Sequence, residues 1–237
     1  QGTGVTITTL VVLYFLYIFL FGRLSPEERR RVAVIPVLFV AAAVFWSGFE
    51  QAGSSMNLFA DRLTDRVVFG MEVPTTWLQS VNPLFIILLA PVFGSLWVRL
   101  GSKNPSISAK FTYGLLMLGL GFLVLAWGAT FATDGGRVSP MWLIVTYFFH
   151  TTGELCLSPV GLSSITKLSP KRLVGQMMGI WFMAAALGNL LAGLVAGLVE
   201  SLALPQLFGA VGLIVLGGGV VMSLASGPVR RLAGDVR

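Results

Sequence analysis

Two glutamates in the middle of long apolar stretches are the residues of this sequence best suited to chemistry. Glu50 lies in FWSGFEQAGSSMNLFAD, residues 45–61, and Glu154 lies in TYFFHTTGELCLSPVGLSS, residues 146–164. A carboxylate near the centre of a membrane-spanning helix costs about 2.5–3.5 kcal/mol, so each glutamate must face protein or a water-filled cavity. There it can hold a proton or a cation. The alternative is a buried polar network that only fixes how the helices pack.

Each glutamate belongs to a row of polar residues at helical spacing. In the first stretch the polar residues recur at steps of three and four: Ser47, Glu50, Gln51, Ser54 and Asn57. In the second stretch they are four positions apart: His150, Glu154 and Ser158. Residues at these separations lie on one face of a helix. We therefore predict two helices, each with a polar stripe that includes a carboxylate.

The same residues do not form a convincing enzyme site. A serine hydrolase would need a nucleophile activated by His150, the one histidine of the chain, but Ser158 lies two turns away on the same helix. A metal site usually needs three or four protein ligands, and one His with one Glu falls short of that number. We predict neither catalysis nor a metal or cofactor. His150 either tunes or shields Glu154, or only packs.

The composition is typical of an integral membrane protein. Apolar residues make up 55% of the chain and charged residues 11%, whereas soluble domains have about 25% charged residues. The net charge of +6 does not indicate nucleic-acid binding, because the basic residues lie in short segments between apolar runs rather than on one face. The single cysteine, Cys156, offers no disulfide framework.

Seven apolar segments are long enough to cross about 30 Å of hydrocarbon. They lie near residues 5–21, 32–58, 76–98, 111–132, 140–161, 173–199 and 206–226. Between the first two, Ser25 followed by Pro26 and two acidic residues is typical of a helix start. We therefore predict a short helix that leads into the second span.

The basic residues alternate between the two sides of the predicted spans. Thirteen of the 16 lie in the segments 22–31, 99–110, 162–172 and 227–237. The other three are Arg62, Arg66 and Arg137. The opposite side instead collects acidic residues: Asp61, Asp65, Glu72, Asp134 and Glu200. Because Lys and Arg concentrate in cytoplasmic loops, we predict that the four basic segments, and with them the C-terminus, are cytoplasmic.

Proline, glycine and a few polar residues mark the remaining spans. Pro83 and Pro91 are expected to kink the third span, and Asn82 beside them either faces a cavity or joins two helices. In the fifth span, Pro159 and Gly161 are expected to weaken the cytoplasmic end of the helix. The fourth span has several glycines and no interior charge, which predicts a packing helix.

The sixth span, GQMMGIWFMAAALGNLLAGLVAGL, carries two pairs of glycines four residues apart. They are Gly175 with Gly179 and Gly193 with Gly197, and this spacing lets helix backbones approach closely. The span also places Trp181 and Asn189 in its interior. Because Trp is more common near membrane surfaces, a Trp at this depth either lines a pocket or fills a gap.

Five stretches that follow one another between about residues 32 and 226 are distinctive: FWSGFEQAGSSMNLFADR, NPLFIILLAPVFGSLW, ISAKFTYGLL, HTTGELCLSPVGLSSITKLSPKR and MMGIWFMAAALGN. Together they resemble the C-terminal half of the proton-dependent oligopeptide transporters, a branch of the major facilitator superfamily. The combination is far more specific than any one string.

The resemblance implies an all-α integral membrane fold. Residues 32–226 would form the C-terminal six-helix bundle of a major facilitator transporter, and residues 1–22 one extra linker transmembrane helix, as in bacterial members. A cytoplasmic connector, residues 23–31, would join them, and residues 227–237 would form a cytoplasmic tail. We expect a fragment that lacks the N-terminal bundle, because the chain starts with Gln1 rather than Met.

The resemblance also implies roles for single residues. Glu50 resembles the family's acidic residue on helix seven, which is implicated in proton binding and in the outer gate. Trp46 would lie one turn earlier in the pocket wall, and Gln51 resembles a pocket amide.

The third and fifth spans would contribute the peptide site. Asn82 and Glu154 are similar to the family's pair that holds the N-terminal ammonium of the peptide. Ser158 and Trp181 resemble pocket-lining positions. His150 matches no family function.

The function implied is proton-coupled symport of di- and tripeptides into the cytoplasm by alternating access, in the inner membrane of a bacterium. The proton gradient would drive it without a cofactor, and its partners would be peptide, protons, the lipid bilayer and the N-terminal bundle. The alternative is a carrier of the same family for another small solute, such as nitrate or a peptide-like compound. A heptahelical receptor or an intramembrane hydrolase fits the residues less well.

Overall fold

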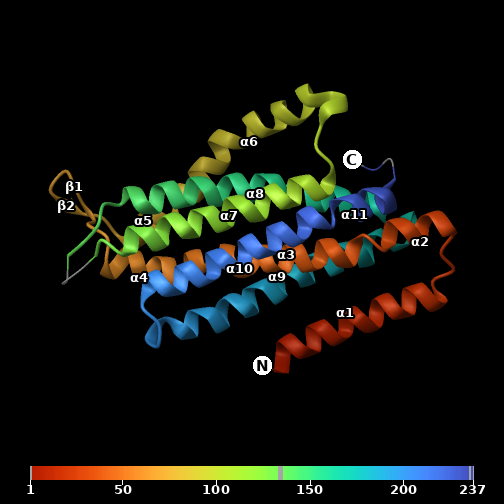
Figure 1. Ribbon diagram of the computed structural model, residues 1–237, viewed down its shortest axis with the longest axis horizontal. Coiled ribbons are helices and arrows are strands. Elements are labelled where there is room, and N and C mark those ends of the chain that lie inside the picture. Colours follow the sequence, from red (N-terminus) through yellow and green to blue (C-terminus); the bar gives the residue numbers. More distant parts are fainter. Residues whose placement is uncertain (1, 133–135, 235, 237) are drawn as a thin grey trace.

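Long helices lie side by side through most of the structure, as the apolar segments predict (Figure 1). The computed structural model describes residues 2–132, 136–234 and 236. Its α-helices are α1 Gly2–Phe21, α2 Pro26–Val32, α3 Ile35–Phe49, α4 Ser55–Arg62, α5 Thr75–Gln79, α6 Val81–Leu100, α7 Ile107–Ala129, α8 Met141–Leu168, α9 Val174–Ala196, α10 Leu204–Leu224 and α11 Ser226–Ala233. Four short 3-10 helices are η1 Glu50–Gly53, η2 Gly101–Lys103, η3 Lys171–Leu173 and η4 Gly197–Glu200, and a two-stranded antiparallel hairpin is formed by β1 Val67–Val68 and β2 Met71–Glu72.

Six helical segments of the described chain are long and apolar enough to span a membrane. They are Gly2–Phe21, Pro26–Arg62, Thr75–Lys103, Ile107–Ala129, Lys171–Glu200 and Leu204–Leu224. These segments confirm six of the seven predicted spans. The seventh, α8, has 28 residues, or about 42 Å of helix, but its polar residues lower its hydropathy. Its neighbours α6, α7 and α9 pack around it, so much of this polar surface is covered by protein.

The central helix of the bundle is α7, which packs against α8 on one side and α10 on the other (Figure 1). A Cβ atom built on Gly119 would lie 3.0 Å from the carbonyl oxygen of Gly212 in α10. A Cβ atom built on Gly153 of α8 would lie 2.7 Å from the carbonyl oxygen of Gly114. These glycines let three backbones approach closely, which confirms the fourth predicted span as a packing helix.

The predicted close approach through the glycine pairs of α9 is wrong. A Cβ atom added at Gly175, Gly179, Gly193 or Gly197 would meet no heavy atom of the described residues within 4 Å. Instead α9 approaches α3 at Gly188, where a Cβ atom would lie 2.9 Å from the Ala43 carbonyl oxygen. The spacing of glycines shows that a smooth helix face exists, but the neighbouring helix packs on a different face of α9.

The first polar stripe does not lie on one continuous helix, which corrects the prediction for residues 45–61. Helix α3 ends at Phe49, η1 covers Glu50–Gly53, and α4 begins at Ser55. At the junction, Ser54 has φ −127° and ψ −97°, well outside the helical region. The amide of Gln51 donates to the Ser47 carbonyl oxygen, so a side chain competes with the helix's own backbone bonds there.

Three other boundaries differ from the predicted ones. Helix α8 continues through Pro159 to Leu168, so most of the predicted loop 162–172 is helical. Pro83 lies in the first turn of α6, where the N–H that proline lacks has no partner within the helix, and it therefore marks a start rather than a kink. Lys110 lies in the first turn of α7 instead of a loop; it is 5% exposed, with its Nζ 4.6 Å from the Trp97 ring centroid.

The predicted helix start at Ser25 is confirmed. The Ser25 hydroxyl accepts from the Glu28 backbone N–H at 3.2 Å, and the Glu28 carboxylate accepts from the Ser25 N–H at 2.9 Å. This reciprocal pair satisfies two N–H groups at the start of α2. Helix α1 lies beside α9, where the Tyr14 hydroxyl donates to Gln176 Oε1 at 2.8 Å.

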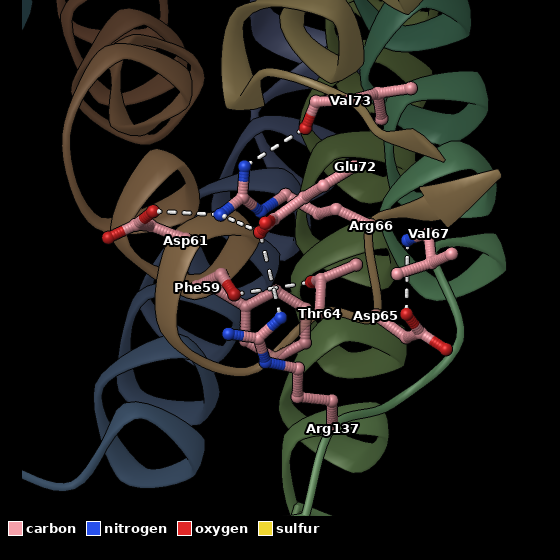
Figure 2. A network of polar contacts seen from close by, with 9 residues as sticks. All are labelled: Phe59, Asp61, Thr64, Asp65, Arg66, Val67, Glu72, Val73 and Arg137. Carbon is pink, nitrogen blue, oxygen red and sulfur yellow. Dashed lines mark hydrogen bonds and ion pairs between the residues drawn. The ribbon is translucent and has the colours of Figure 1, made fainter. Parts of the chain in front are cut away.

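The opposite end of the molecule carries a network of ion pairs around Arg66 (Figure 2). The Arg66 guanidinium lies 2.8 Å from Glu72 and 3.3 Å from Asp61, and it donates to the Val73 carbonyl oxygen at 2.9 Å. Arg137 approaches Glu72 at 3.7 Å. The network ties the β1–β2 hairpin to the end of α4. Asp134, which the sequence assigns to this side, lies outside the described residues.

Candidate functional site

The structure brings Asn82 and Glu154 together from two different helices. The Nδ2 of Asn82, near the start of α6, donates to Glu154 Oε2 on α8 at 3.4 Å. The same nitrogen donates to the Thr151 hydroxyl at 2.9 Å. The break between α5 and α6 at Ser80 places Asn82 in the first turn of α6, beside the middle of α8. An amide and a carboxylate from separate spans therefore share one site.

Thr151 is a site residue that the sequence reasoning missed. It lies three positions before Glu154, so it belongs to the same face of α8. The predicted stripe followed steps of four from His150 and passed over it. A signal was present, because two threonines precede Glu154 and a hydroxyl one turn away is a suitable partner for an amide.

Glu50 is the second glutamate that the sequence places among apolar residues. It is the first residue of η1, and its side chain is exposed, whereas Glu154 and Asn82 are half-buried. The end of α3 at Phe49 turns the chain so that Glu50 leaves the helix at this point. The structure therefore joins Glu154 to Asn82 by a hydrogen bond, whereas Glu50 lies exposed at the junction of α3 and η1.

Trp46 lies one turn before Glu50 and is half-buried. Its ring packs edge to face with Phe45 and Phe49, at centroid distances of 5.6 and 5.3 Å. The main chain of α9 passes directly beneath it, since a Cβ atom on Gly188 would lie 2.5 Å from the Trp46 Cβ. Trp46 is therefore held in place at the contact between α3 and α9.

Gln51 is fully buried, and both ends of its amide are bonded within the chain. Its Nε2 donates to the carbonyl oxygens of Ser47 and Ala192, at 3.2 and 3.1 Å. Its Oε1 accepts from the hydroxyls of Ser54 and Ser55, at 3.2 and 2.8 Å. This amide stabilises the break after α3 and fastens it to α9.

Ser158 and Trp181 lie in different surroundings. Ser158 is half-buried on α8, one turn after Glu154. Trp181 of α9 is only 4% exposed and packs on Gly161, where an added Cβ atom would lie 2.1 Å from its ring. Its ring also meets Phe111 of α7 edge to face at 6.2 Å. Trp181 therefore fills the contact between three helices, and Asn189 on the same helix is exposed.

His150 packs in the interior of the bundle. It is 1% exposed, its ring centroid lies 4.6 Å from that of Phe122, and it covers Gly121. Its Nε2 has no hydrogen-bond partner among the residues that the structure describes. Of the two readings of His150, this environment favours packing. Within the described ranges, no three His, Cys, Asp or Glu residues gather as a metal site.

The chain is similar in sequence to a known protein family and to characterised transporters. The model of a family described as PTR2, POT family, matches residues 5–214. The chain is 45% identical to the peptide transporter YePEPT of Yersinia enterocolitica subsp. palearctica, over 98% of this chain and 47% of that protein. It is 31% identical to a di-/tripeptide transporter of Lactococcus lactis subsp. cremoris, over 95% of this chain and 46% of that protein.

Solved structures agree with the sequence relatives. A crystal structure of peptide transporter POT in complex with sulfate matches with a TM-score of 0.88 and 38% identity, over 97% of this chain and 46% of that one. A POT family transporter in complex with 5-aminolevulinic acid matches with a TM-score of 0.88 and 30% identity, over 96% of this chain and 47% of that one. The chain thus spans about half the length of the relatives it matches.

Proposed function

This chain belongs to the POT family, and we propose that it is the C-terminal half of a secondary transporter that carries di- and tripeptides with protons into the cytoplasm. In this proposal residues 32–226 form the six-helix bundle of a major facilitator transporter. Residues 1–22 form a linker helix, residues 23–31 a cytoplasmic connector and residues 227–237 a cytoplasmic tail. The chain acts as a carrier rather than an enzyme, in the inner membrane of a bacterium.

The observation that carries the proposal is the contact between Asn82 and Glu154. Asn82 uses its Nδ2 to bind Glu154 and Thr151, and its amide oxygen is an acceptor. A carboxylate oxygen and an amide oxygen side by side suit an ammonium group, which has three donors and no acceptor. Every unmodified peptide brings such a group at its N-terminus, so one fixed anchor serves many side-chain sequences.

In this proposal Glu50 is the second ionisable group of the same cavity. Two carboxylates that face one cavity favour binding of a proton over two negative charges, whereas an arriving cation favours the ionised form of the carboxylate that it contacts. The peptide ammonium therefore neutralises the negative charge of Glu154, and the proton neutralises that of Glu50. Release of both on the other side of the membrane completes one cycle of alternating access.

The exposed position of Glu50 supports a second bundle that would cover this face. In the proposed transporter, the N-terminal bundle closes the cavity opposite Glu50, Asn82 and Glu154 and provides cationic partners for the carboxylate end of the peptide. Trp46 and Ser158 lie near these residues and would line the cavity. Gln51 and Trp181 would instead hold the helices that shape it, because both are buried.

A carrier of another small solute of the same family is the second candidate. A relative in this family has been solved with 5-aminolevulinic acid, which also carries a primary amine. The Asn82–Glu154 contact fits any compound with an ammonium group, so peptide-like amines are compatible with this site. It opposes nitrate, because two carboxylates repel an anion.

The test is the Glu154→Gln variant of the full-length protein, reconstituted into vesicles. We expect proton-driven uptake of a dipeptide to fall at least 10- to 100-fold, since a charge-assisted hydrogen bond is worth about 1.5–3 kcal/mol.

The Glu50→Gln variant should lose proton-driven uptake but retain exchange of peptide against peptide. Glu200→Gln, at an exposed site far along the chain, is the matched control and should transport normally. Normal proton-driven uptake by Glu154→Gln would refute the proposed role.

A further inference from the structure

An apolar groove runs along the contact between α3 and α10, away from the Glu50–Glu154 site. Its volume is about 480 Å³, and the residues that line it include Val37, Val40, Val44, Leu115, Gly218 and Val221. Val40 and Val221 are 60% and 66% exposed, so the groove opens sideways from the bundle. At the floor of the groove α10 approaches α3 closely, since a Cβ atom built on Gly218 would lie 3.1 Å from Val44 Cγ1.

A basic pocket lies between α2 and α11, which pack against each other at one end of the molecule (Figure 1). Its volume is about 420 Å³, and its charged residues are Glu27, Arg30, Arg31 and Arg231. Arg31 pairs with Glu27 at 2.7 Å. Arg30 and Arg231 make no ion pair with any residue of the described chain, and both are exposed. The pocket therefore has an excess of positive charge.

The helices of the groove are the chain neighbours of those of the pocket, since α2 leads into α3 and α10 leads into α11. The chain runs from Arg30 in α2 to Pro36, which lines the end of the groove, within six residues. It runs from Ala225, which also lines the groove, to Arg231 in α11 over the same separation. Both α3 and α10 belong to segments able to span a membrane. Since six residues of helix rise about 9 Å, the end of the groove at Pro36 and Ala225 lies at the same end of the molecule as the arginines of the pocket.

We propose that the groove and the pocket together bind one anionic phospholipid. Its phosphate contacts Arg30 and Arg231, and one acyl chain lies along the groove against Val40 and Val221. Arginines beside a membrane attract anionic headgroups, and basic pockets between spanning helices bind them. The groove is lined almost entirely by hydrocarbon, which suits an acyl chain and gives a free phosphate ion no partner.

Native mass spectrometry of the purified full-length protein in detergent tests the headgroup site. The probes are phosphatidylglycerol and phosphatidylcholine with the same acyl chains, with inorganic phosphate as competitor. We expect phosphatidylglycerol to bind more tightly, and Arg30→Gln with Arg231→Gln to weaken it about 30-fold, from about 1 kcal/mol for each arginine. The double variant Arg62→Gln with Arg99→Gln removes the same charge from exposed positions outside the pocket and should bind normally.

A second pair of variants tests the groove. Val221→Trp fills it and should weaken phosphatidylglycerol binding, whereas Leu213→Trp, at a position of α10 that is 64% exposed and does not line the groove, should not. Equal affinity for the two lipids overturns the proposal even if an arginine variant fails to fold. Complete displacement by inorganic phosphate would indicate a simple anion site and overturns it too. Cross-linking of a cysteine at Val221 to another segment of the full-length protein would show that polypeptide, not lipid, covers the groove.

Discussion

At the scale of single residues, the site depends on a hydrogen bond between helices rather than on any one side chain. Asn82 donates to both Thr151 and Glu154, and these two bonds hold its amide between α6 and α8. The polar stripe pattern pointed to Glu154, but it did not identify Thr151, the hydroxyl that shares the Asn82 amide with it.

A residue-scale prediction concerns two glycines of α9. A Cβ atom at Gly188 would lie 2.5 Å from the Trp46 Cβ and 3.0 Å from the Ser47 backbone nitrogen. Because backbone atoms cannot move aside easily, Gly188→Ala should destabilise the protein by about 1–3 kcal/mol. Gly179→Ala meets nothing within 4 Å among the described residues and should stabilise α9 by up to about 1 kcal/mol.

The thermal unfolding midpoint of the full-length protein in detergent measures both glycine variants. The expected shifts have opposite signs, down for Gly188→Ala and up for Gly179→Ala. Equal shifts in one direction would mean that the helix contact between α3 and α9 does not depend on Gly188.

At the scale of elements, polar side chains join segments that are far apart in the sequence. Gln51 fastens the break after α3 to the carbonyl of Ala192 in α9. Arg172, in η3, fastens the start of α2 to the connection between α8 and α9. Its Nη1 and Nη2 donate to the two carboxylate oxygens of Glu28 at 2.9 and 3.2 Å, and Nη2 also reaches the carbonyls of Gly22 and Arg23. Through this contact helix α1 is attached at its end as well as along its length.

The element-scale prediction is that Arg172→Gln loosens the α1–α2 connection. The ion pair is partly exposed, and solvent screens such pairs, so global stability should change little. Local opening should change more, because two backbone carbonyls lose their donor as well. Hydrogen exchange of the amides of residues 22–28 should become several-fold faster.

The control for this prediction is Lys171→Gln, which removes the same charge from the neighbouring exposed residue. It should leave exchange at residues 22–28 unchanged. If both variants accelerate exchange equally, the effect is one of net charge, and the bidentate contact has no local role.

At the scale of the whole molecule, the two ends of the bundle differ in charge. One end carries the hairpin and the Arg66 network, where acidic residues pair with arginine (Figure 2). The other end carries α2 and α11 with the arginine-rich segments (Figure 1). Cytoplasmic loops are enriched in Lys and Arg, so this asymmetry supports the proposal that α2 and α11 face the cytoplasm.

Cysteine labelling of the full-length protein tests this orientation at the whole-molecule scale. In a background without cysteine, which in this chain requires Cys156→Ala, Phe69→Cys places a thiol at the tip of the hairpin, where the side chain is 99% exposed. A membrane-impermeant maleimide should label it in intact cells. Gly227→Cys, on the exposed surface of α11, should react only after the cells are permeabilised. The reverse pattern would overturn the orientation.

The sequence by itself determined the properties that depend on local physics. Six of seven spans, the capped start of α2 and the packing role of α7 follow from hydropathy, capping chemistry and glycine content. The helical position of Glu154 amid polar residues follows from periodicity, and the cost of a carboxylate in hydrocarbon predicts that it has a polar partner, which is Asn82. Each of these signals lies within one stretch of about twenty residues.

Only the tertiary structure decided which neighbour covers each face. It buried Gln51 and Trp181, which resemble pocket residues, and it exposed Asn189. It placed the close approach of α9 at Gly188 rather than at the spaced glycine pairs. Periodicity defines the faces of a helix, but burial, hydrogen-bond partners and close contacts depend on atoms contributed by segments far away in the chain.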